Sequence, residues 1–155
     1  MPHHHRLAEL DGLVGTLLGH SGWVTVDQPM IDSFAAATGD HQWIHVDRAR
    51  AEREIGGTIA HGYLTLSLIP RLTAEILEIR DAGRRINYGL DRVRFPAPVP
   101  AGSRLRLALT LAACEAVAEG RRLALDAVLE REGAERPACA ARCITLAIAD
   151  GFTAR

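Results

Sequence analysis

Two acid–base side chains lie five residues apart in the segment GDHQWIH, at residues 39–45. A carboxylate and an imidazole aimed at one small volume can hold a water between them, so that one group accepts its proton while the other orients it or returns a proton to a substrate. Asp40 and His45 are therefore candidates for proton-transfer chemistry. The structural alternative is that Asp40 only closes the turn after Gly39, and that His45 is a partly buried imidazole with satisfied hydrogen bonds.

A second segment, IAHGY at residues 59–63, stands before a long apolar stretch. The first backbone N–H groups of a helix lack an internal acceptor and carry a partial positive charge. Gly62 has no side chain, so a substrate oxygen can approach its N–H closely. We expect an oxyanion site at Gly62, and we expect His61 to fix the local turn by hydrogen bonding.

Together these segments resemble the hydratase motif of the MaoC-like family, the (R)-specific enoyl-CoA hydratases and 3-hydroxyacyl-thioester dehydratases. That motif has Gly-Asp, any residue, Asn-Pro, an apolar residue and then His, so Asp40 and His45 match its catalytic positions. Gln42 and Trp43 stand where Asn and Pro are usual, and this variant resembles a subgroup with NodN-like and mycobacterial-type dehydratases. The likeness continues through IAHGYLTLSLIPRL at residues 59–72 and INYGLDRVRFPAPVPAG at residues 86–102.

The resemblance implies a lyase of fatty acid metabolism that reversibly hydrates trans-2-enoyl thioesters to (R)-3-hydroxyacyl thioesters, carried by coenzyme A or acyl carrier protein. Asp40 and His45 would activate the water, while Gly62, His61 and Gln42 would bind the thioester; a solvent-facing Gln42 fits equally well. No cofactor is expected, because coenzyme A is part of the substrate. Metal binding by His41, His45 and His61 is a weaker alternative, since zinc sites need three or four converging ligands, and we expect no metal.

Two other functions remain open from the sequence. An Asp beside an activated water could attack the thioester carbonyl, which would make the protein an acyl-CoA thioesterase of the same fold. If the changes at Gln42 and Trp43 displaced the catalytic pair, the protein would be a non-catalytic acyl-binding protein. Release of free thiol would distinguish a thioesterase from a hydratase. Ligand binding without turnover would identify a non-catalytic acyl-binding protein.

Length, charge and cysteine content limit the binding partners and the cellular compartment that we expect. A chain of 155 residues with a net charge of −1 indicates a single domain, residues 1–155, and disfavours nucleic acid as a partner. No apolar stretch is long enough for a signal peptide or a membrane span, and three cysteines without a CxxC pair indicate a reducing compartment, so we expect a cytoplasmic protein that does not bind membranes. His3, His4 and His5 are expected at a mobile terminus without a function.

Arginines near the first predicted strands are candidates for the phosphates of coenzyme A, because guanidinium groups bind phosphate in a forked geometry. Arg94 is favoured among them, since it lies in the family-like segment. The family resemblance also implies a homodimer in which two sheets join edge to edge. Tyr88, in the same segment, is expected in the core.

Helix signals dominate the first half of the chain. Asp27 can cap a helix that Gly39 ends, and Asp47 can cap a short helix over residues 48–53. Pro70 should kink or break the buried helical stretch at residues 60–79. A helix at residues 6–19 and a strand at residues 22–26 complete this half.

The second half alternates apolar and polar residues in three runs, at residues 104–111, 123–129 and 140–148. A period of two predicts strands with one buried face, and the prolines at residues 96–100 predict a loop. Helices followed by consecutive strands indicate an α+β domain. The family resemblance implies the hot-dog fold, an antiparallel sheet wrapped around a long buried central helix.

Overall fold

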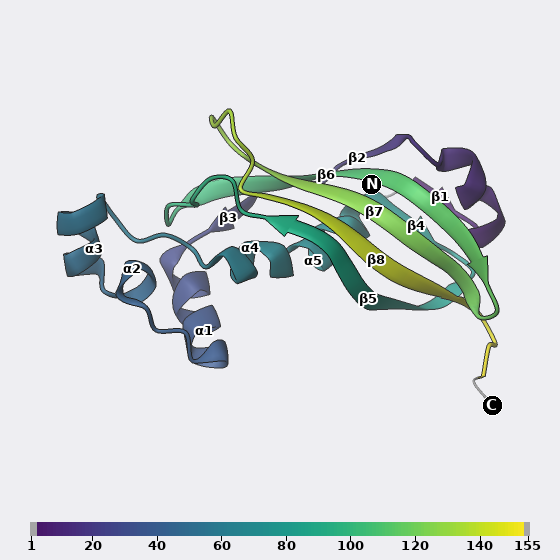
Figure 1. Ribbon diagram of the computed structural model, residues 1–155, viewed down its shortest axis with the longest axis horizontal. Helices are drawn as coiled ribbons and strands as arrows, with labels where there is room; N and C mark the ends of the chain where they lie inside the picture. Colours follow the sequence, from purple (N-terminus) through teal and green to yellow (C-terminus); the bar gives the residue numbers. More distant parts are fainter. Residues whose placement is uncertain (1–2, 154–155) are drawn as a thin grey trace.

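One antiparallel sheet curves over a pair of short helices in the computed structural model, which describes residues 3–153 (Figure 1). The order of its strands is β2–β6–β7–β8–β5, and β3 also pairs with β6. The strands are β2 (Leu17–His20), β3 (Val24–Val26), β5 (Ala82–Arg94), β6 (Ser103–Val117), β7 (Gly120–Arg131) and β8 (Cys139–Ala149). The predicted combination of early helices and later consecutive strands is confirmed.

The core lies between the concave face of the sheet and the helices. Alternate residues of β6 and β7 are buried, and the residues between them are partly exposed. Leu105, Leu107, Leu109 and Leu111 of β6 are fully buried, which confirms the period-two prediction. Apolar burial of this kind is the main favourable term in folding, so this face of the sheet fixes where the helices lie.

The helical stretch under the sheet is broken, as Pro70 predicted. It forms α4 (Gly62–Ser67) and α5 (Ile69–Ile76), and Pro70 lies in the first turn of α5. The expected end of the helical stretch at residue 79 is wrong, because α5 ends at Ile76 and the chain continues as β4 (Leu77–Ile79). The expected burial of the stretch holds for most of it, but the side chain of Tyr63 is 69% exposed.

The N-terminal segment differs from its prediction. Instead of one helix over residues 6–19, it forms a 3-10 helix, η1 (Leu7–Leu13), followed by β2 on the edge of β6. Gly15 turns the chain between them with a φ of 83°, a conformation that favours glycine. The expected mobile histidine run is instead the strand β1 (His3–His5), which pairs in parallel with β4. Partners distant in the sequence therefore override the local helical pattern.

Three helices stand beyond one end of the sheet (Figure 1). They are α1 (Gln28–Thr38), α2 (Trp43–Val46) and α3 (Arg48–Ile55). The predicted caps are confirmed: Asp27 accepts a hydrogen bond from the Met30 N–H, Asp47 accepts one from the Arg50 N–H, both at 3.0 Å, and Gly39 ends α1 with a φ of 78°. The single turn α2 was not predicted. In residues 3–153 no helix is both long and apolar enough to cross a bilayer.

Strand β5 forms the open edge of the sheet. It pairs with β8 on one side, and no strand among the described residues pairs with its other side. Ile86, Tyr88 and Leu90 are exposed on it, and Tyr88 is 64% exposed. The expectation of Tyr88 in the core is therefore wrong, because an edge strand has no neighbouring strand to cover its side chains.

Candidate active site

The side chain of His45 is buried and is held in a defined tautomer. It lies in α2, is only 7% exposed, and its backbone N–H donates to the Gln42 carbonyl oxygen at 2.9 Å. Its Nδ1 lies 2.7 Å from the carbonyl oxygen of Ile59. A carbonyl oxygen can only accept, so Nδ1 carries the proton and Nε2 keeps a lone pair.

Asp40 lies in the turn that follows Gly39, with its side chain exposed. Its carboxylate accepts a long hydrogen bond, 3.4 Å, from the Gln42 N–H. Its backbone carbonyl accepts a hydrogen bond of 2.9 Å from His61 Nε2. The turn is therefore fixed through the backbone, while the carboxylate stays available to a substrate or a water.

His61 joins the two candidate catalytic residues. It is 2% exposed, and its ring stacks on that of His45 with 3.7 Å between centroids and 26° between planes. Since Nε2 donates to Asp40, Nδ1 carries a lone pair, and this buried atom has no hydrogen-bond partner within residues 3–153. The prediction that His61 fixes the local turn at the start of α4 is wrong, because its ring makes no capping hydrogen bond there. It holds the turn at Asp40 instead and stacks on His45.

These three side chains converge. One atom from each of Asp40, His45 and His61, a carboxylate oxygen and two ring nitrogens, lies within 4.8 Å of the other two. For such a triangle some point lies no more than about 2.8 Å from every corner, 4.8 Å divided by √3, and this is the length of a hydrogen bond to water. The arrangement can therefore hold a water, which donates its two hydrogens to two of these atoms.

The same three side chains are the set that could bind a metal ion. Zinc binds its nitrogen and oxygen ligands at about 2.0–2.2 Å, along lone pairs that converge on the ion. The imidazoles of His45 and His61 stack with 26° between their planes. Nδ1 of His45 and Nε2 of His61 lie at hydrogen-bond distance from the carbonyl oxygens of Ile59 and Asp40, which leaves one nitrogen on each ring for a ligand. His41, the third histidine of the alternative metal set, is exposed and is not part of the cluster, so the set of His41, His45 and His61 is not brought together.

Gly62 is the first residue of α4, and no acceptor for its N–H is found among residues 3–153. A Cβ at this position would lie 2.9–3.1 Å from three atoms of the Phe95 ring. Glycine is therefore required here by a neighbouring side chain as well as by any approaching substrate. This contact could not be predicted from the sequence, because Phe95 lies far along the chain, directly after β5.

Two predicted binding residues have exposed side chains. Gln42 contributes backbone groups to the turn, and its side chain makes no hydrogen bond within the described part of the chain. Arg94 is exposed at the end of β5, next to Phe95, and its Nη1 donates to the Val93 carbonyl at 2.7 Å. No carboxylate in residues 3–153 forms an ion pair with Arg94, so its guanidinium remains available to an anion.

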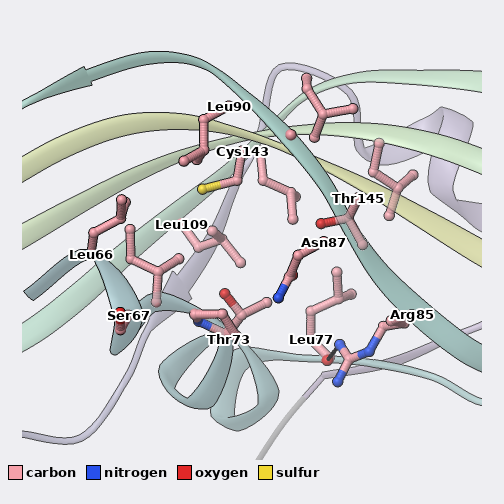
Figure 2. A pocket seen from close by; sticks show the side chains of 16 residues that line it. Leu66, Ser67, Thr73, Leu77, Arg85, Asn87, Leu90, Leu109, Cys143 and Thr145 are labelled. Atoms are coloured by element: carbon pink, nitrogen blue, oxygen red, sulfur yellow. Dashed lines mark hydrogen bonds between the residues drawn. The ribbon is translucent and has the colours of Figure 1, made fainter. Parts of the chain in front are cut away.

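A cavity of about 400 Å³ lies between the helices α4 and α5 and the inner face of the sheet, beside β5 (Figure 2). Leu66 and Ser67, at the end of α4, line it, and β5 lines it before reaching Phe95 at Gly62. The helix α4 and the strand β5 therefore connect the cavity to the start of α4. Along the helix axis, Gly62 lies about 6 Å from Leu66.

The thiols near this cavity are not nucleophiles at neutral pH. Burial, with a smaller effect from the charge of Asp126, raises the pKa of Cys143 in the cavity wall to about 11. Burial, with a smaller effect from Cys143, raises the pKa of Cys139 to about 11 as well. Because the thiolate is the reactive form, both are structural residues, and all three cysteines are free, as predicted.

The chain is similar in sequence and in fold to several known proteins. The MaoC-like domain family matches residues 10–131. The 3-hydroxyacyl-thioester dehydratase Z of Mycobacterium tuberculosis is 45% identical over 145 residues, 92% of this chain and 96% of that protein. Nodulation protein N of Rhizobium leguminosarum bv. viciae is 45% identical over 148 residues, 93% of this chain and 92% of that protein. The unliganded R-hydratase PhaJ1 from Pseudomonas aeruginosa superposes with a TM-score of 0.74 at 23% identity, over 97% of this chain and 92% of that chain. The fold is the hot-dog fold of these dehydratases.

Proposed function

Because the chain belongs to the MaoC-like dehydratase family, we propose that it is a lyase that adds water reversibly to trans-2-enoyl thioesters, giving (R)-3-hydroxyacyl thioesters. The observation that carries this proposal is the convergence of Asp40, His45 and His61 around a point at hydrogen-bond distance from all three. The relative with 45% identity is named a 3-hydroxyacyl-thioester dehydratase, which supports the same reaction.

His45 is the proton carrier in this scheme. In hydration, its Nε2 accepts a proton from the water as the water oxygen bonds to the β-carbon, and the electrons of the double bond pass to the thioester as an enolate. The same Nε2 then returns the proton to the α-carbon, so that one water is added in total. The Nδ1 contact with Ile59, at 2.7 Å, keeps the neutral ring in the tautomer that leaves Nε2 free to accept.

Asp40 orients the water, and His61 orients both catalytic groups. The Asp40 carboxylate accepts the second hydrogen of the water, which turns an oxygen lone pair toward the β-carbon. His61 holds the Asp40 backbone through Nε2 and supports the His45 ring by stacking. A general base of this kind contributes typically about 10²–10⁴-fold in rate.

The enolate oxygen is stabilised at the start of α4 in this proposal. The Gly62 N–H has no competing acceptor among residues 3–153, and removal of one oxyanion donor costs about 10²–10³-fold in kcat in well-studied enzymes. Arg94, exposed beside Phe95, is the candidate contact for a phosphate of coenzyme A or of a carrier-protein arm. The scheme needs no cofactor beyond the thioester itself, and the free cysteines fit a reducing compartment such as the cytoplasm.

The direct test is hydration of crotonyl-CoA, followed by loss of the conjugated thioester, with free thiol measured in parallel. Asp40→Asn and His45→Ala should each lower kcat by about 10²–10⁴-fold while thermal unfolding shows a folded protein. His41→Ala, in the same loop but exposed, should keep the rate. Near-normal hydration by either variant would contradict the catalytic role of the substituted residue. Release of free thiol in place of hydration would identify a thioesterase.

We also propose that the protein is a homodimer joined through β5. This strand is 13 residues long and exposes apolar side chains on an unpaired edge, an arrangement that invites pairing with another strand. Two copies of β5 in antiparallel register would extend the sheet across a two-fold axis. Tyr88→Lys should reduce the mass in sedimentation from dimer to monomer, while Leu17→Lys, an exposed leucine on the other edge strand β2, should leave the dimer intact. A monomeric unmodified protein would contradict the proposal.

A further inference from the structure

Three polar side chains point into a cavity that is otherwise lined mostly by leucine and isoleucine (Figure 2). They are Thr73 from α5, Asn87 from β5 and Thr145 from β8. Asn87 and Thr145 are direct partners across the two strands, and Thr73 comes from the helix that faces them. None of the three side chains makes a hydrogen bond to another residue in the described range 3–153. Thr73 is buried, Thr145 is half-buried and Asn87 is exposed at the edge of the sheet.

An acyl chain is the ligand that the position of this cavity favours, since α4 and β5 connect it to the proposed thioester site. A plain alkyl chain would remove water from two hydroxyls and an amide without replacing any of their hydrogen bonds. Polar groups left unpaired in this way oppose binding. A site built for a polar substrate group therefore discriminates against the analogue that lacks it.

We propose that the preferred substrate carries a hydroxyl or keto oxygen on its acyl chain, beyond the reacting carbons, and that Thr73, Asn87 and Thr145 bind this oxygen. This inference rests on the proposed function in one respect: it assumes that the acyl chain reaches the cavity as part of a thioester substrate. Asn87 offers two donors and one acceptor, and each threonine hydroxyl can donate or accept, so the three groups satisfy a hydroxyl or a keto oxygen. The lining leucines, such as Leu109, Leu123 and Leu125, contact the methylene groups.

Thr73, Asn87 and Thr145 are neutral, so the ligand group that they recognise is a neutral oxygen. Arg85 also lines the cavity, and its Nη1 donates to the Leu77 carbonyl oxygen at 2.9 Å.

The test compares pairs of enoyl-CoA esters of equal length, one plain and one with a hydroxyl group, with the hydroxyl moved stepwise along the chain. We expect kcat/KM to favour the hydroxylated ester by about tenfold or more at one position, the discrimination expected when a plain chain leaves the buried Thr73 hydroxyl unpaired. Turnover of crotonyl-CoA, whose chain ends before any such position, reports the proposed function separately. Equal kcat/KM for every pair would overturn the proposal while leaving hydration intact.

Two variants locate the recognition. Thr145→Val and Asn87→Leu should each reduce the hydroxylated-to-plain ratio toward one. Thr110→Val is the matched control, because Thr110 lies on β6 between the buried Leu109 and Leu111 and so faces outward, and it should keep the ratio. Calorimetric binding of saturated acyl-CoA pairs provides the same comparison without turnover, so that a slow variant still gives a result. A ratio that survives in both cavity variants would overturn the assignment of these residues.

Discussion

Alanine at position 62 adds one methyl group at the start of α4, against the ring of Phe95. Its Cβ would lie 2.9, 3.0 and 3.1 Å from Phe95 Cδ2, Cγ and Cε2, closer than carbon atoms normally approach. In a helix, alanine is favoured over glycine by up to about 1 kcal/mol, whereas overpacking typically costs about 1–3 kcal/mol. Because the Phe95 side chain is 40% exposed and can move, we expect a net loss of only about 1 kcal/mol, or about 2–4 °C in Tm.

The effect on activity should be much larger than the effect on stability. If the start of α4 shifts to relieve the clash, the backbone N–H of residue 62 no longer meets the thioester oxygen. Loss of an oxyanion donor costs about 10²–10³-fold in kcat, and a displacement of about 1 Å costs about 10²-fold. Gly62→Ala should therefore lower kcat for crotonyl-CoA by about 10²-fold while the protein remains folded in thermal unfolding.

A second substitution separates the clash from other effects of the methyl group. Phe95→Ala removes all three ring atoms that the new Cβ would meet. The double variant should therefore recover kcat to within a few-fold of Phe95→Ala alone, a coupling that a double-mutant cycle measures. If the double variant is as slow as Gly62→Ala, the methyl group blocks the substrate directly and the steric reasoning is wrong. If Gly62→Ala hydrates crotonyl-CoA normally, the clash is relieved without displacing the backbone N–H and the steric reasoning is wrong.

Three further predictions concern the frame around the site. Gly120→Ala should destabilise the fold by about 3 kcal/mol in chemical unfolding, because φ is +152° and a Cβ would lie 2.2 Å from the Ala147 oxygen; Gly12→Ala, with open space around it, is the control that should change little. Cys143, whose pKa is raised to about 11 by burial, should react with iodoacetamide at pH 8 only after unfolding, and fast labelling of the native protein would contradict this. Two hydrogen bonds of 2.7 Å from Arg142 lower the pKa of Asp126, so the pair stabilises the fold above about pH 4 and loses this contribution as the pH falls through the lowered pKa. The unfolding free energies of wild type and Asp126→Asn should accordingly differ at pH 7 and converge in acid, and an equal difference at both pH values would refute this origin.

Features that depend on one turn of chain could be predicted from the sequence alone. The caps at Asp27 and Asp47, the end of α1 at Gly39 and the break near Pro70 all follow from interactions within four residues. The alternating strands were likewise evident, because side chains on a strand change face at every residue. Family resemblance added Asp40 and His45 as a pair, although the spacing alone left their convergence open.

The remaining features depend on which distant residues lie opposite each other. Residues 6–19 have a helical pattern, yet the end of this segment became part of β2 because the edge of β6 was available to pair with it. The His3–His5 strand exists because Leu77–Ile79 lies beside it, and Tyr88 is exposed because β5 has no second neighbour in the described chain.

The candidate active site likewise combines features that the sequence predicts with features that depend on tertiary packing. The sequence determined the chemical groups of the catalytic turn, since Asp40, His45 and Gly62 are short-range motif positions next to helix ends. Only the tertiary structure decided that His61 stacks on His45, that Phe95 fills the space beside Gly62, and that Thr73 faces Asn87 and Thr145 across a cavity. Local hydrogen bonds and side-chain periodicity act over a few residues and can be recognised in the chain, whereas packing joins segments whose separation in sequence carries no information about their contact.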